Sequence, residues 1–192
     1  MQYQLRKEIL EPHYMAGYGR LEYCAMYKVW QEEKKIGQFF ISDEVAFYAY
    51  DDEDVRIDYV RRAFRRTLYP IIDQKTQQPF GGYDRQHYSS SWTPYGKLFL
   101  GDAVYRTKKA GSCKLGSRPQ IDNLDVWMGN LEQSVHFDVR ITRPQPWYKR
   151  PRLYKGELEG TVTLHGDSLR LLFCSLFLLE QVIEFEDDTS GG

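Results

Sequence analysis

Two side chains on one expected strand could perform acid–base chemistry. Residues 135–142 alternate apolar and polar side chains, which predicts a strand that places His136 and Asp138 on the same face. A carboxylate can orient an imidazole to act as a general base. The outward face of a strand is normally polar, so a solvent-facing pair is the interpretation we favour, and a small hydrolase is a third functional hypothesis.

Ser168 could be a nucleophile, because Gly166-Asp-Ser-Leu169 matches the block that carries the serine in one class of esterases. Those enzymes need a downstream Asp-x-x-His pair to supply the general base. Here no histidine follows the block, and no third residue orients His165. We therefore predict a hairpin turn or a helix N-cap here, in which Asp167 or Ser168 accepts a hydrogen bond from the first amides of the helix.

Basic side chains at two places could bind anions such as RNA or lipid headgroups. The first cluster has helical spacing, which predicts one compact patch, although a solvated face is the commoner outcome. The second lies in a proline-punctuated loop and is interleaved with aromatic residues, as at membrane interfaces or sites for unpaired nucleic acid. The residues are Arg61, Arg62, Arg65 and Arg66 in the first cluster and Lys149, Arg150 and Arg152 in the second.

Aromatic residues in expected loops are candidates for self-association. Large, fairly rigid aromatics dominate interface hot spots because they release much apolar surface from water at a small entropic cost. Long loops in compact domains are usually functional or disordered. The residues chosen on this basis are Trp92, Tyr95, Trp147 and Tyr148.

Bulk composition bounds the class of protein. The formal net charge of −1 argues against a generic nucleic-acid binder, and 15 tyrosines favour a sheet-rich fold that buries surface against a partner. The three cysteines lack metal-ligand spacing, which indicates a reducing compartment, and we expect neither a metal nor a cofactor. No signal peptide is evident and the apolar C-terminal run is too short to span a membrane. We expect an intracellular, cytoplasmic or virion-associated protein that is not secreted.

Hydrophobic periodicity predicts an α+β fold. Residues 14–50, 97–106 and 135–142 are typical of strands, whereas 73–96 have the composition of a loop and 121–127 are ambiguous. Residues 54–70 predict an amphipathic helix, because their apolar side chains form one continuous stripe. That stripe contains Ile57, Val60, Phe64, Leu68 and Ile71.

The C-terminal third carries the clearest signal. Residues 158–164 alternate as a half-buried strand does, and 168–185 are apolar on nearly every face. We expect a helix over 168–185, packed on a mostly antiparallel sheet, with Arg170, Glu180 and Glu184 in solvent. The competing hypothesis is that this run stays exposed for a membrane or partner. Residues 1–192 would form one domain, with the extreme N-terminus and 186–192 flexible.

The segment from Arg150-Pro-Arg-Leu-Tyr-Lys-Gly to Leu164 resembles the late strand of rhabdovirus matrix proteins of the vesicular-stomatitis type. In that family a basic loop leads into Leu-Tyr-Lys-Gly, a Thr-rich strand and a C-terminal helix. The order of the other expected elements is also similar. The family's lysine-rich arm and Pro-Pro-x-Tyr motif do not occur in this sequence. The resemblance therefore implies self-assembly and condensation of a ribonucleoprotein.

Our leading hypothesis is a non-enzymatic, self-associating structural protein similar to a viral matrix protein. It would bridge a nucleocapsid and a membrane, or neighbouring copies of itself. Its expected partners are further copies of the chain, nucleocapsid or RNA, and an acidic membrane surface. The alternative is a module that holds a small apolar ligand in its interior.

Overall fold

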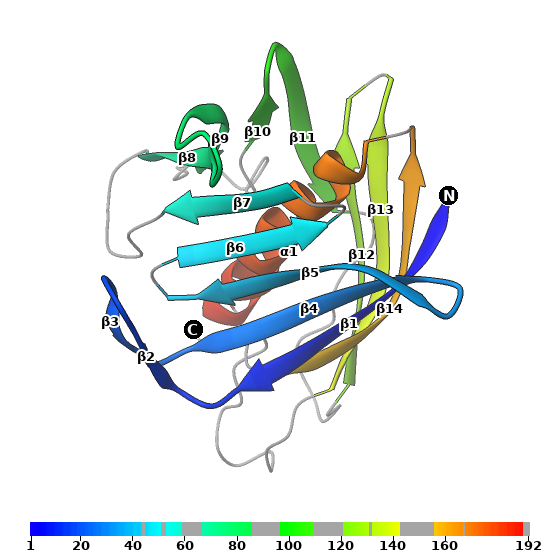
Figure 1. Cartoon of the computed structure of the whole chain (residues 1–192). Coiled ribbons are helices and arrows are strands. Elements are labelled where there is room, and N and C mark those ends of the chain that lie inside the picture. The colour runs from blue at the N-terminus through cyan, green and yellow to red at the C-terminus, as the bar shows by residue number, and fades with distance from the viewer. Residues whose placement is uncertain are drawn as a thin grey trace.

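The chain folds into a closed antiparallel β-barrel with one helix, shown by the computed structural model in Figure 1. The structure describes residues 1–43, 45–50, 53–58, 67–85, 97–109, 121–130, 132–142, 156–166 and 168–189. Around the barrel the strand order is β1-β14-β13-β12-β11-β10-β9-β8-β7-β6-β5-β4, with β4 paired to β1. The elements are β1 (Gln2–Leu10), β2 (His13–Met15), β3 (Gly19–Leu21), β4 (Cys24–Gln31), β5 (Lys34–Ser42), β6 (Val45–Tyr50), β7 (Glu53–Asp58), β8 (Thr67–Asp73), β9 (Pro79–Arg85), β10 (Lys97–Leu100), β11 (Ala103–Lys109), β12 (Ile121–Gly129), β13 (Ser134–Thr142), β14 (Glu157–His165) and α1 (Leu169–Thr189).

Closure of the barrel depends on the pairing of its first and last strands. β1 pairs antiparallel with β14, where Tyr3 is opposite Val162, and with β4 on its other side. The amino group of Met1 donates a hydrogen bond of 2.7 Å to the carbonyl oxygen of Leu164. The chain from Gln2 onward forms part of the barrel wall. The connection from β1 to β4 in the chain forms the β2–β3 hairpin, a separate two-stranded sheet.

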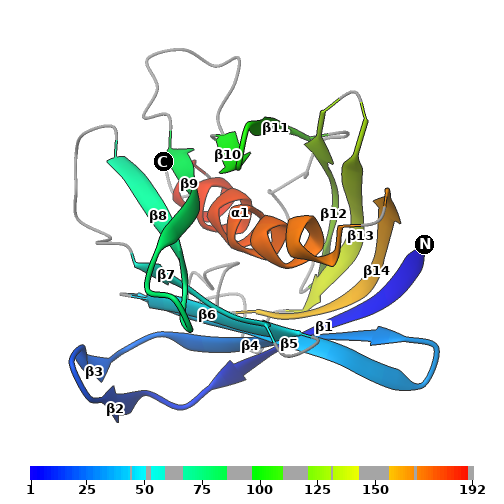
Figure 2. The same ribbon diagram turned by 45° about the horizontal axis from the view of Figure 1, so that its top comes forward.

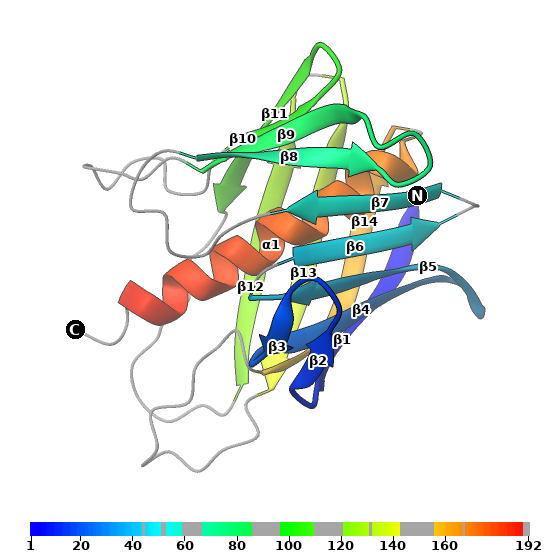
Figure 3. The ribbon, with the colours of Figure 1, turned by 60° about the vertical axis from the view of Figure 1, so that its left-hand side comes forward.

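Helix α1 occupies the interior of the barrel (Figure 2). Every residue from Leu171 to Glu180 is buried, as expected for a helix that is apolar on nearly all sides and enclosed. Gly37 on β5 allows a close approach of helix and wall, because a Cβ there would lie 2.3 Å from the ring of Phe173. Viewed from the side, the C-terminal turns of α1 extend past the ends of β5 and β6 (Figure 3).

The expected α+β fold with two helices is wrong. The C-terminal helix exists and continues to Thr189, but the barrel surrounds it on all sides instead of supporting it on one face. Residues 53–58 and 67–73, within and beside the expected helix at 54–70, are strands β7 and β8, while 59–66 lie outside the described residues.

The physical reason is that two periodicities fit the same apolar residues. Val55 and Ile57 are buried while Asp54 is exposed, which is alternation of period 2. Ile57 then pairs directly with Ile71, so two members of the expected helical stripe meet across a strand seam. Pairing with neighbouring strands decided between the two patterns, and local periodicity does not contain that information.

Other strand assignments were incomplete. The segment 73–96, expected to be a loop, contains β9. The ambiguous residues 121–127 lie in β12, and the strand expected over 97–106 is divided into β10 and β11 by a turn at Gly101 and Asp102. The strands at 135–142 and 158–164 are confirmed as parts of β13 and β14.

Buried tyrosines line much of the space between the barrel wall and α1. Tyr50 stacks on Phe173 with ring centroids 4.9 Å apart. Tyr83 packs against Phe177 and donates a hydrogen bond of 2.5 Å to the carbonyl oxygen of Cys174. The buried tyrosines are Tyr3, Tyr23, Tyr27, Tyr48, Tyr50, Tyr69, Tyr83 and Tyr105.

The buried tyrosines predict a loss of stability at alkaline pH. Burial raises the pKa of Tyr27, Tyr48 and Tyr83 above 10.0, the ordinary value. These groups stay protonated in the folded state while the unfolded chain loses protons, so their contribution is complete below about pH 10 and falls above it. We expect a decline of up to about 1.4 kcal/mol per pH unit for each tyrosine. Chemical denaturation between about pH 8 and 11 measures it, with Tyr83→Phe reducing the slope. An unchanged free energy of unfolding over that range would contradict the prediction.

Truncation after Asp167 should abolish cooperative folding, because it removes the helix that fills the barrel. Each fully buried leucine or phenylalanine contributes on the order of 2 kcal/mol, so several of them equal the stability of an ordinary domain. Circular dichroism and thermal unfolding of the fragment measure the effect, and deletion of residues 190–192 is the control. A soluble fragment that unfolds cooperatively would show that α1 is an appendage.

Candidate functional site

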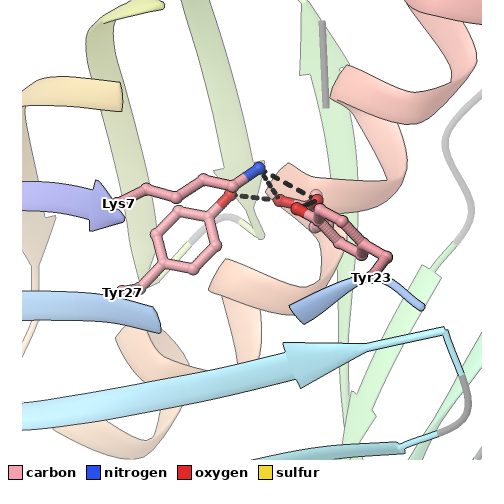
Figure 4. A network of polar contacts seen from close by, with 4 residues as sticks. Lys7, Tyr23 and Tyr27 are labelled. Carbon is pink, nitrogen blue, oxygen red and sulfur yellow. Dashed lines mark hydrogen bonds and ion pairs between the residues drawn. The ribbon is translucent and has the colours of Figure 1, made fainter. Parts of the chain in front are cut away.

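A buried polar network fastens α1 to the barrel wall (Figure 4). Lys7 on β1 is 1% exposed and Glu180 on α1 is 3% exposed. The Lys7 Nζ donates hydrogen bonds to Glu180 Oε1 at 3.0 Å and Oε2 at 2.7 Å. The hydroxyl of Tyr23 donates to Oε1 at 2.5 Å, and that of Tyr27 on β4 donates to Oε2. We expected Glu180 to reach solvent, and the structure shows the opposite.

Each charge in this network is compensated by its neighbours. Both carboxylate oxygens of Glu180 accept two hydrogen bonds, and the Lys7 ammonium also lies 5.6 and 5.4 Å from the ring centroids of Tyr23 and Tyr27. Burial, followed by the charge of Glu180, raises the pKa of Tyr27. A buried charge is tolerated only when it is paired and hydrogen-bonded, as it is here. The arrangement is suited to holding the helix against the wall. It is less suited to nucleophilic catalysis by Lys7, because a nucleophilic lysine needs a neutral amine and this one is paired with a carboxylate.

The sequence contains a signal for this network, although neither Lys7 nor Glu180 was among the predicted site residues. Residues 2–9 alternate, so Lys7 falls in the same phase as Tyr3 and Leu5, which face the interior. A lysine at a core position needs an anionic partner. Glu180 stands in the middle of a run of buried apolar residues and was the obvious candidate. Lys7 and Glu180 are 173 residues apart in the chain, so no local sequence pattern could show that they pair.

A cleft on the outer wall is the second place where functional groups gather. Arg6 on β1 is opposite Glu159 on β14, which is in turn opposite Arg140 on β13, so the three form one row across adjacent strands. Trp30 on β4 adds an aromatic ring, with the Arg6 guanidinium 6.0 Å from its centroid. We name this volume of about 660 Å³ the Trp30 cleft, and it is lined by Gln4, Leu5, Arg6, Trp30, Glu32, Arg140, Glu159 and Gly160.

The side chains selected from the sequence as anion-binding or self-association residues all lie outside the described residues. This holds for the two basic clusters and for the aromatic loop residues, so these assignments stay predictions. They are Arg61, Arg62, Arg65, Arg66, Lys149, Arg150 and Arg152, and Trp92, Tyr95, Trp147 and Tyr148.

Three of the residues considered for catalysis are described with their contacts. Ser168 Oγ accepts a hydrogen bond of 3.1 Å from the amide of Leu171, which confirms the helix-cap prediction. His136 stacks on Trp127 with ring centroids 4.0 Å apart, and His165 lies 6.0 Å from the same indole. Asp138 is exposed beside them on the outer face of β13. The two imidazoles therefore belong to an aromatic cluster on the outer wall.

Comparison with known proteins yields no relative: no family model, curated protein or solved structure matches the chain. Within the described residues, no group of three or more His, Cys, Asp and Glu side chains could hold a metal ion. In that same part of the chain, no helix has the length and apolar character needed to cross a membrane.

Removing one partner of the Lys7–Glu180 pair should destabilise the protein by roughly 3–5 kcal/mol, because the other charge remains buried and unpaired. Lys7→Met combined with Glu180→Gln removes both charges. The amide oxygen can accept from one tyrosine hydroxyl and the amide nitrogen can donate to the other, so the double variant should recover much of the loss. A double-mutant cycle by chemical denaturation measures the coupling.

The ion pair between Glu8 on β1 and Lys28 on β4 is the matched control. Its Nζ–Oε2 distance is 2.6 Å and its side chains are 30% and 40% exposed, so Lys28→Met should cost less than about 1 kcal/mol. Equal costs for Lys7→Met and Lys28→Met would mean that the buried pair does not fasten α1.

Proposed function

We propose that the protein is a non-enzymatic, self-associating structural protein that acts through its outer wall and loops. The observation that carries the proposal is the position of α1, because every residue from Leu171 to Glu180 is buried inside the barrel. A barrel of this kind is a rigid body whose interior is already filled by its own chain. Other molecules then meet the outer faces of the strands and the connections between them.

The alternative of a small apolar ligand in the interior has less support. An apolar ligand needs an enclosed cavity of a few hundred Å³, and α1 takes the position such a ligand would use. Phe173 and Phe177 fill the space against Tyr50 and Tyr83, with ring centroids 4.9 and 4.3 Å apart. Ligand entry would require α1 to leave, which breaks the Lys7–Glu180 pair.

The proposed partners are further copies of the chain, together with nucleocapsid or RNA and an acidic membrane surface. The resemblance to rhabdovirus matrix proteins motivates these partners, and an intracellular or virion-associated location follows from the same proposal. One part of the resemblance has lost its basis, since the helix expected near 54–70 is strand at 53–58 and 67–70. The strand that carries the resemblance corresponds to β14.

Self-association should appear as a molar mass that rises with concentration above the 22.7 kDa of one chain. Size-exclusion chromatography with light scattering, over a range of salt and protein concentrations, measures it. Trp147→Ala with Tyr148→Ala should weaken assembly, because buried aromatic anchors supply much of the free energy of an interface.

Tyr14→Ala is the control for this experiment. Tyr14 is an aromatic on the β2–β3 hairpin with 78% of its surface exposed, and the proposal assigns it no role. The double variant should keep the thermal stability of the wild type. A wild-type protein that stays strictly monomeric at high micromolar concentration would contradict the proposed function.

A further inference from the structure

We propose that the Trp30 cleft binds a nucleotide, either free or as one unit of single-stranded RNA. The inference rests on the proposed function in one respect, namely that the outer wall is the surface that meets partners. It adds the chemical class of the anionic partner and a site for it. The three kinds of side chain in the cleft match the three parts of a nucleotide.

Two guanidiniums are available for the phosphate. Arg6 and Arg140 are exposed and lie two strands apart, on either side of Glu159, which corresponds to about 10 Å between their backbones. Three ion pairs in the described part of the chain are Lys7–Glu180, Arg20–Glu22 and Lys28–Glu8. Neither cleft arginine takes part in these three pairs, and the Arg6 guanidinium lies 6.0 Å from the centroid of the Trp30 ring. Exposed guanidiniums of this kind can bind a phosphate in the bidentate manner that arginine favours.

An indole ring is available for the base. Trp30 is partly exposed on β4 and lies beside the Arg6 guanidinium, 6.0 Å from its ring centroid. The register between β4 and β5 shifts between Val29 and Trp30, and such bulges re-aim side chains at binding sites. Sites for unpaired nucleic acid combine arginine with an aromatic platform on which a base stacks.

Two carboxylates separate a nucleotide from a simple anion. Glu32 and Glu159 line the same cleft, so its formal charges are balanced and it would attract inorganic phosphate weakly. A carboxylate accepts hydrogen bonds from ribose hydroxyls, as in dinucleotide sites, and from exocyclic amines. A ligand that carries a phosphate, a sugar diol and a planar base satisfies all of these groups together.

The dimensions of the cleft suit this ligand. Its volume of about 660 Å³ falls within the range of small-molecule sites. Gly160 on β14 also lines the cleft.

Titration of the full chain with AMP, with inorganic pyrophosphate and with a short single-stranded RNA tests the inference by calorimetry. AMP should bind more tightly than pyrophosphate. Arg6→Gln, Arg140→Gln and Trp30→Leu should each weaken AMP binding about tenfold or more, and Trp30→Phe should largely preserve it. Arg20→Gln removes an exposed guanidinium on the β2–β3 hairpin and should have no effect. Thermal unfolding establishes that each variant is folded.

Salt dependence and the RNA arm identify the source of the nucleotide. For RNA held by Arg6 and Arg140, a plot of the logarithm of the affinity against the logarithm of salt concentration should have a slope of about −1.4. Arg140→Gln should halve this slope, because one phosphate contact is lost. RNA binding much tighter than AMP binding indicates a nucleic-acid strand, whereas equal affinities indicate a free nucleotide.

Three results would overturn the inference: no binding of AMP or RNA, equal binding of AMP and pyrophosphate, or nucleotide binding that the cleft variants leave unchanged. Light scattering on the same samples measures self-association, so the proposed function is tested independently of nucleotide binding. Variants that lose nucleotide and still self-associate support the inference and leave the proposed function intact. A monomeric wild type that binds AMP supports the inference and removes the proposed function.

Discussion

The constraint on which this structure depends is that a closed barrel must fill its interior and satisfy every polar group placed there. Helix α1 fills it with apolar side chains, and the wall contributes tyrosines whose rings pack while their hydroxyls find acceptors. In the Lys7–Glu180 pair, two opposite full charges meet inside the barrel. Because that pair joins β1 to α1, it fixes the position of the helix along the barrel and its rotation about its own axis.

The same constraint is the basis for proposing that the protein acts through its outer surface. Because the buried residues Leu171–Glu180 of α1 occupy the interior of the barrel, the proposed binding surfaces are the outer faces of the strands. On those faces the alternation of each strand presents a polar row, and Arg6, Glu159 and Arg140 belong to one such row across three strands. The same alternation that buries Lys7 thus exposes Arg6, its neighbour in the chain.

The sequence predicted the parts of the fold that are local. The strands at 135–142 and 158–164, the C-terminal helix and the Ser168 cap all follow from periodicity or from hydrogen bonds between near neighbours. Barrel closure between β1 and β14 and the burial of Glu180 against Lys7 depend on residues more than 150 positions apart, and no local pattern contains them. The helix expected at 54–70 failed because Ile57 and Ile71 fit both periods, and strand pairing decided between them.

The candidate site was predictable only in part. Lys7 in the inward phase of its strand and Glu180 within an apolar helix were visible in the sequence. The Trp30 cleft depends on the register of four strands, which the sequence does not show. The most direct test of a helix locked inside the barrel is native-state hydrogen exchange of α1. We predict that the amides of Leu171–Ile183 exchange only through global unfolding, with the same free energy as the amides of β13. Exchange of the helix at a clearly lower free energy than the wall would show that α1 leaves the barrel independently, and would contradict the locked arrangement.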